Sequence, residues 1–129
     1  MKQDDFNSGI PEDVWESAKE EARKAMIAVA KRKEVITYSD LVNKIVSCRL
    51  EPRSQELAHM LGEISSNEHG AGRGMLSVLV VHKSGDCMPG PGFFELASLL
   101  GSNVEDHMEF WIRELKKVHE TWSSAPSAQ

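Results

Sequence analysis

Apolar residues recur at intervals of three and four along residues 15–29, which is the spacing of one face of an α-helix. The apolar positions there are Trp15, Ala18, Ala22, Ala25, Met26 and Val29. Pro11 suits the first turn of a helix, and the acidic residues that follow it favour the positive end of the helix dipole. The pattern therefore predicts a first helix that begins near residue 11 and ends near the basic run 31–33.

Two further helices are predicted between residues 37 and 64. Thr37 followed by Asp40 resembles a capping box, and an apolar side follows at Leu41, Val42, Ile45 and Val46. Pro52 can open a third helix. Its inward positions are Leu57, Met60, Leu61 and Ile64, and its outward positions are Arg53, Glu56, His59 and Glu63. Residues 65–74 lack periodicity and carry three glycines, so we expect a flexible loop there.

Residues 75–83 carry the β-rich run of the chain. Four consecutive apolar residues, 78–81, indicate a strand that is covered on both faces. Residues 84–86 have turn chemistry, and residues 87–88 can pair back before the Pro-Gly-Pro-Gly run of 89–92 ends the ladder. We therefore expect a small β-hairpin. Gly90 and Gly92 are expected to permit a sharp reversal, so Gly92→Val should unfold this region.

Two helices are predicted after the hairpin. The first covers residues 93–100, is anchored by Phe93 and Phe94, and is closed by Gly101. Ser102 with Glu105 resembles a capping box for the last helix. The apolar stripe of that long C-terminal helix is Val104, Met108, Trp111, Leu115, Val118 and Trp122.

Length and charge limit the classes of function. The 129 residues fit one domain, which we place at 11–122 between a flexible N-terminus, 1–10, and a disordered tail, 123–129. A formal charge of −5 disfavours a polyphosphate partner unless the basic residues gather on one face. Two cysteines without metal-type spacing and the absence of a signal-like or membrane-length apolar segment predict a soluble cytoplasmic protein.

The predicted order of helix, short helix, helix, strand and turn is that of an α+β winged helix-turn-helix. The matching residues are Val14-Trp15, the run from Val35 to Val42, Val80-Val81 and Gly85. On these residues the chain resembles the C-terminal domain of the alkylguanine DNA alkyltransferases and the alkyltransferase-like proteins over about 75 residues. The resemblance implies a winged-helix fold, and it matches Tyr38 to a DNA-contact position.

The departures from that family matter more than the matches. Residues 76–79, Leu-Ser-Val-Leu, replace the family's Pro-Cys-His-Arg motif, so the alkyl-accepting cysteine is absent. The family's intercalating arginine aligns with Glu56. The sequence therefore argues against alkyl transfer and gives no support to base flipping.

Nucleic-acid binding by the winged route needs cationic and amide side chains on and around the third helix. Residues 31–60 carry six basic groups against four acidic ones, a local excess of two positive charges. The candidate nucleic-acid-binding residues are Tyr38, Lys44, Arg49, Arg53, Gln55 and His59. A solvated helix surface of mixed charge explains the same residues.

An enzyme is the alternative hypothesis. A small hydrolase-type site would use Arg73 for an anion, His82 as base and Glu95 as the orienting carboxylate, with Asp86 nearby. No known catalytic motif accompanies them, and no metal-ligand spacing joins the histidines and cysteines, so we assign no cofactor and no metal.

A third hypothesis is a protein-interaction module, because the last helix carries two tryptophans on its apolar stripe. Trp111, Leu115, Val118 and Trp122 would then contact a protein partner or a second copy of the chain. Overall the sequence predicts a non-catalytic winged-helix-like protein that binds a nucleic acid or a protein. The enzyme and the homodimeric adaptor without nucleic-acid binding stay as alternatives.

Overall fold

The computed structural model describes residues 10–52, 54–82 and 88–123. Residues 1–9 and 124–129, which contain most of the expected flexible N-terminus and tail, lie outside the described residues. The same holds for Arg53 and for residues 83–87, on which the turn of the expected hairpin, Gly85 and Asp86 fall.

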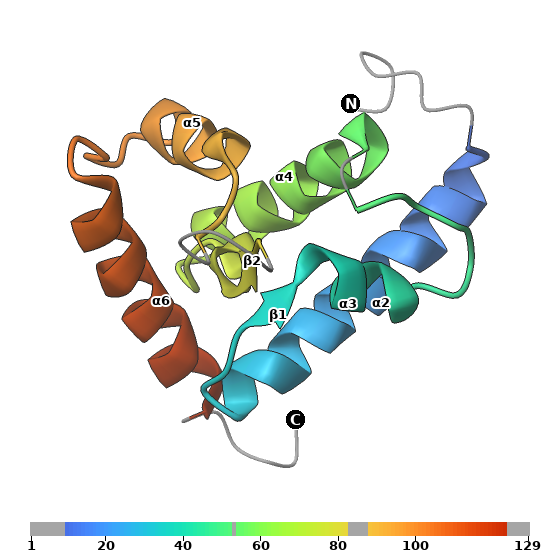
Figure 1. Ribbon diagram of the computed structural model, residues 1–129, viewed down its shortest axis with the longest axis horizontal. Coiled ribbons are helices and arrows are strands. Elements are labelled where there is room, and N and C mark those ends of the chain that lie inside the picture. The colour runs from blue at the N-terminus through green and yellow to red at the C-terminus, as the bar shows by residue number, and fades with distance from the viewer. Residues whose placement is uncertain (1–9, 53, 83–87, 124–129) are drawn as a thin grey trace.

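The described residues form five α-helices, one 3₁₀ helix and two short strands (Figure 1). In chain order they are α2 (Glu12–Lys31), β1 (Ile36–Thr37), α3 (Tyr38–Asn43), α4 (Gln55–Gly70), η1 (Leu76–Leu79), β2 (Val80–Val81), α5 (Pro91–Leu99) and α6 (His107–Ser123). The protein is thus mostly helical with a small sheet, which agrees with the expected α+β class.

The sheet differs from the expected hairpin. β1 and β2 pair in parallel, with Ile36 opposite Val80 and Thr37 opposite Val81. Residues 76–79, expected in a strand, form the 3₁₀ helix η1 instead. A continuous apolar run indicates that the segment is buried on all sides. Periodicity alone does not distinguish a buried strand from a buried helical turn. A backbone hydrogen bond of 3.0 Å from the His82 amide to the Met88 carbonyl does bring residue 88 back beside β2, as expected.

η1 is the central segment of the core. It packs against α2, α4 and α6, which surround it in Figure 1. Leu76, Val78 and Leu79 are fully buried. The indole Nε1 of Trp111 donates to the Val78 carbonyl at 3.1 Å, so α6 is attached to η1 by a polar contact as well as by packing.

α4 is longer at its C-terminal end than the apolar pattern predicts. It begins at Gln55, where the Ser54 hydroxyl accepts from the Leu57 amide, and it continues to Gly70. The prediction of a loop at 65–74 is therefore wrong for residues 65–70, which belong to α4. Inward positions of the last turns are the polar residues Ser65 and Glu68, which are buried with hydrogen-bond partners and so are invisible to a hydrophobicity pattern.

α3 begins as predicted and ends early. The Thr37 hydroxyl accepts from the Asp40 amide at 3.1 Å, but the helix stops at Asn43. Val46, expected on its apolar side, is 79% exposed. The Glu21 carboxylate of α2 accepts from the Val46 and Ser47 amides at 3.0 Å, so these donors bond outside the helix.

The two C-terminal helices show one confirmed and one wrong cap. Gly101, at φ 97°, closes α5, and the Ser102 amide donates back to the Ala97 carbonyl at 2.9 Å. α6 begins at His107 rather than after Ser102. The carboxylate of Asp106 accepts from the Glu109 amide at 3.0 Å and supplies the cap expected of the Ser102 and Glu105 pair.

Gly92 does not need to be glycine. It lies in the first turn of α5, it is absent from the residues with positive φ, and a Cβ there would meet no atom within 4 Å. The expectation that Gly92→Val unfolds the region therefore has no steric basis. Gly74 does need to be glycine, because its φ is 92° and a Cβ would lie 3.0 Å from Val118.

Candidate binding groove

A groove of about 1190 Å³ runs along α4, with the first half of α2 on one side and α5 on the other. In Figure 1, α4 lies between α5 and α2, which agrees with this placement. The groove is lined by residues from every described element except β2 and α6. Leu57 and Leu61 of α4 and Phe93 and Leu96 of α5 give it an apolar part.

Glu63 is the central polar residue of the groove. Its side chain is 10% exposed, yet the sequence pattern placed it on the outer face of its helix. Its Oε1 accepts from the Trp15 indole Nε1 at 3.0 Å and from Lys19 Nζ at 3.2 Å. His59 Nε2 lies 3.1 Å from Oε2, which agrees with the expected common face of residues 59 and 63. Both α2 and α4 therefore hold this carboxylate in place.

The protonation of the groove follows from these contacts. Burial by itself would raise the pKa of Glu63, but hydrogen bonds from Trp15 and Lys19 and the nearby positive charge outweigh it, so the pKa is lowered. Burial would lower the pKa of Lys19, but the hydrogen bond and charge of Glu63, joined by Glu16, raise it. Both groups are thus charged at neutral pH.

Tyr38 and His82 form the aromatic end of the groove. Their ring centroids are 5.0 Å apart with an interplanar angle of 36°. The Gly90 amide donates to the Tyr38 hydroxyl oxygen at 2.9 Å, which attaches the segment before α5 to the start of α3. Burial raises the pKa of Tyr38, and the Gly90 hydrogen bond opposes this in part, so the phenol is neutral at physiological pH.

The predicted nucleic-acid-binding residues do not all line the groove. Tyr38 and His59 line the groove. Lys44, Arg49 and Gln55 are exposed and do not line it. Arg53 lies outside the described residues.

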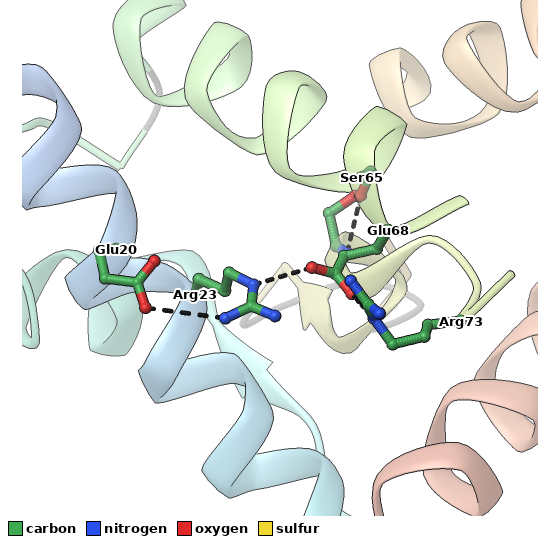
Figure 2. A network of polar contacts seen from close by, with 6 residues as sticks. Glu20, Arg23, Ser65, Glu68 and Arg73 are labelled. Carbon is green, nitrogen blue, oxygen red and sulfur yellow. Dashed lines mark hydrogen bonds and ion pairs between the residues drawn. The ribbon is translucent and has the colours of Figure 1, made fainter. Parts of the chain in front are cut away.

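The predicted catalytic residues do not all line the groove either. His82 lines the groove, whereas Arg73 and Glu95 do not. Arg73 instead bonds to the buried carboxylate of Glu68, which also accepts from Arg23 Nε at 2.8 Å (Figure 2). Glu95 is exposed on α5. The hydrolase-type site is therefore not assembled around the groove, because a structural ion cluster holds its arginine.

The predicted partner-binding stripe of α6 belongs to the core of the same chain. Val118 is fully buried, and Trp111, Leu115 and Trp122 pack partly buried against that core. The large apolar side chains exposed on α6 are Met108 and Ile112. Packing against η1 and α2 therefore accounts for the apolar pattern of this stripe, and the contact with a partner stays a prediction.

Sequence reasoning missed Lys19 and Trp15 as partners of Glu63. Their spacing of four along α2 puts both on one helix face, and the i, i+4 pair of His59 and Glu63 does the same on α4. These two spacings are visible in the sequence. That the two faces meet is not, because it depends on how α2 packs against α4.

Comparisons of the chain with protein-family models, with curated proteins and with solved structures found no match. Within the described residues no helix is long and apolar enough to cross a membrane. In the same part of the chain no three His, Cys, Asp or Glu side chains are grouped so that they could hold a metal ion.

Proposed function

We propose that the protein is a non-catalytic binding protein of winged-helix-like arrangement, and that its groove receives a segment of a protein partner. The volume of the groove carries this proposal. At about 1190 Å³ it exceeds the range of about 300–1,000 Å³ that is common for small-molecule sites. Its length along α4 and its mixed apolar and polar lining suit a peptide segment.

The polar groups of the groove support binding rather than bond-making. Glu63 is held by three side chains and has a lowered pKa, so it is a poor proton acceptor at neutral pH. Tyr38 is neutral and hydrogen-bonded to Gly90. Such fixed groups orient a bound chain without needing to move protons.

The charge of the groove favours protein over nucleic acid. Among the described residues, its lining carries the carboxylates of Glu12, Glu16 and Glu63 against the single ammonium of Lys19. A phosphate backbone needs the opposite sign, because most of its affinity comes from cationic side chains.

A peptide selection tests the proposal. Ala58 is exposed on α4 and lines the groove, so Ala58→Trp should obstruct it without disturbing the core. Ala28 is exposed on α2 away from the groove, and Ala28→Trp is the matched control. Random peptides of about 12 residues displayed on phage should yield binders to the wild type and to Ala28→Trp that do not bind Ala58→Trp. Failure to recover any such peptide would contradict the proposal.

Nucleic-acid binding is the second candidate, and the Tyr38 and His82 ring pair favours it. Aromatic rings in a groove can stack on unpaired bases, and Tyr38 is the residue that matches a DNA contact in the resembling family. Anisotropy of a labelled duplex and a labelled single strand, each about 20 nucleotides long, measures it at low and high salt. Binding that weakens steeply with salt and is lost in Lys44→Glu/Arg49→Glu would favour this candidate over the protein partner.

A further inference from the structure

The occupant of the groove can be specified further from its charge. Lys19, the cation of the lining, is already bonded to Glu63 at 3.2 Å and lies 3.3 Å from Glu16. Lys19 can balance one negative charge, and the described lining holds no other Lys or Arg to balance the charges of the other two glutamates. The described lining thus has a formal excess of two negative charges, carried by Glu12 and Glu16 of α2 and Glu63 of α4 against Lys19.

These carboxylates differ in accessibility. Glu63 is nearly buried, while Glu12 and Glu16 are exposed at the start of α2. An incoming cation can reach the exposed pair without displacing the contacts of Glu63.

The other wall offers apolar and aromatic surface. Leu96 of α5 is partly buried and can contact an apolar side chain, and Leu57 and Leu61 of the core lie behind it in the lining. The ring of Tyr38 stands at one end of the groove, and an aromatic face attracts ammonium and guanidinium groups. The groove thus combines an apolar region with anionic and aromatic surroundings.

Resting on the proposed function, we infer that the groove recognises a peptide segment that carries lysine or arginine side chains next to an apolar anchor residue. The anchor lies between α4 and α5, and the cationic side chains face Glu12 and Glu16. An acidic or uncharged peptide lacks the attraction that the α2 side provides.

Three synthetic peptides test this inference. Each has about 11 residues, the same apolar centre and flanks of lysine, of glutamate or of serine, and each is followed by fluorescence anisotropy with the full chain. The lysine peptide should bind about tenfold more tightly than the serine peptide, and the glutamate peptide should bind more weakly than either. Affinity for the lysine peptide should fall as salt rises, because the glutamates concerned are exposed.

Paired variants locate the effect. Glu12→Gln/Glu16→Gln should weaken the lysine peptide about fivefold, which corresponds to two exposed ion pairs. Glu105→Gln/Glu120→Gln removes the same charge from exposed positions outside the groove and should change affinity less than about twofold. Equal weakening by both pairs, or equal affinity for the three peptides, would overturn the inference.

The outcomes distinguish this inference from the proposed function. If phage selection yields groove-dependent peptides without basic residues, the groove binds protein segments but the inferred chemistry is wrong. If no peptide depends on Ala58, the proposed function fails together with it. Salt-dependent binding of the DNA probes that competes with the lysine peptide would assign the groove to nucleic acid and overturn both.

Discussion

Two glutamates of α4, five residues apart, have nearly the same chemistry and opposite surroundings. Glu63 bonds to Lys19 and Trp15 of α2. Glu68 bonds to Arg23, one turn further along α2, and to Arg73. Each carboxylate is buried by at least nine-tenths, and each has a pKa lowered by its partners against the effect of burial.

The difference between the two clusters is what covers them. The guanidinium groups of Arg23 and Arg73 each lie 5.8 Å from the ring centroid of Trp122, near the end of α6. Figure 2 shows the arginines reaching Glu68 from opposite sides. No residue of α6 lines the groove at Glu63. The cluster at Glu68 thus joins α6 to α2 and α4, whereas the cluster at Glu63 borders the groove and has no cover from α6.

Removing the covered carboxylate should have the largest effect on stability. Glu68→Ala leaves two arginines facing each other without their common partner, and we expect a loss of about 3–5 kcal/mol in the free energy of unfolding. Urea denaturation measures it. Glu120→Ala, at an exposed position of α6, is the control and should change stability by less than about 0.5 kcal/mol.

Acid should weaken the same cluster without deleting it. Because the pKa of Glu68 is lowered in the folded chain, its contribution is present above the ordinary glutamate pKa of about 4.3 and is lost as pH falls through the lower folded value. Urea unfolding between about pH 5 and pH 2 should therefore show falling stability. Glu68→Gln should flatten this dependence, and an unchanged slope would contradict the assignment. Glu63 contributes in the same direction, since its pKa is also lowered.

Glu63→Ala should cost less than Glu68→Ala. We expect about 1–3 kcal/mol, because Lys19 can turn toward Glu16 and the solvent of the open groove once its partner is gone. The difference in the free energy of unfolding between the two alanine variants, measured by urea denaturation, gives the contribution of the α6 cover to the Glu68 cluster. Equal losses would show that the groove end is as closed as the α6 end.

Trp122→Leu should have a smaller effect that depends on Glu68. The loss of the ring beside two guanidinium groups should cost about 0.5–2 kcal/mol. In a Glu68→Ala background the arginines are no longer fixed, so the same substitution should cost less. A double-mutant cycle in urea measures this coupling, and strict additivity would contradict it.

The smallest effect is expected at Gly92, on the open side. Gly92→Ala should change stability by less than about 0.5 kcal/mol, because its Cβ meets no atom within 4 Å. Gly74→Ala, on the α6 side, is the contrast and should cost about 1–3 kcal/mol, since its φ is 92° and the Cβ would lie 3.0 Å from Val118. Thermal unfolding of the two variants measures the difference.

The elements follow from the sequence where an apolar face and a local cap agree. α2 and the cap of α3 at Thr37 are predicted, as is the closure of α5 by Gly101. The length of α4 is not, because Ser65 and Glu68 occupy inward positions as polar residues. A hydrophobicity pattern predicts that a polar residue is exposed, and only the structure shows the buried hydrogen-bond partner that allows it to point inward.

The sequence by itself determined a mostly helical α+β chain, the starts of α2 and α3, and the residues that can carry charge or hydrogen bonds. Only the tertiary structure decided that residues 76–79 form a 3₁₀ helix rather than a strand. It also decided that the apolar stripe of α6 packs against the core and that Glu63 and Lys19 line a groove. Spacing along one helix fixes which side chains share a face. Packing between segments far apart in the chain decides which helix faces contact each other and which contact stays open to solvent. Local periodicity does not predict that packing.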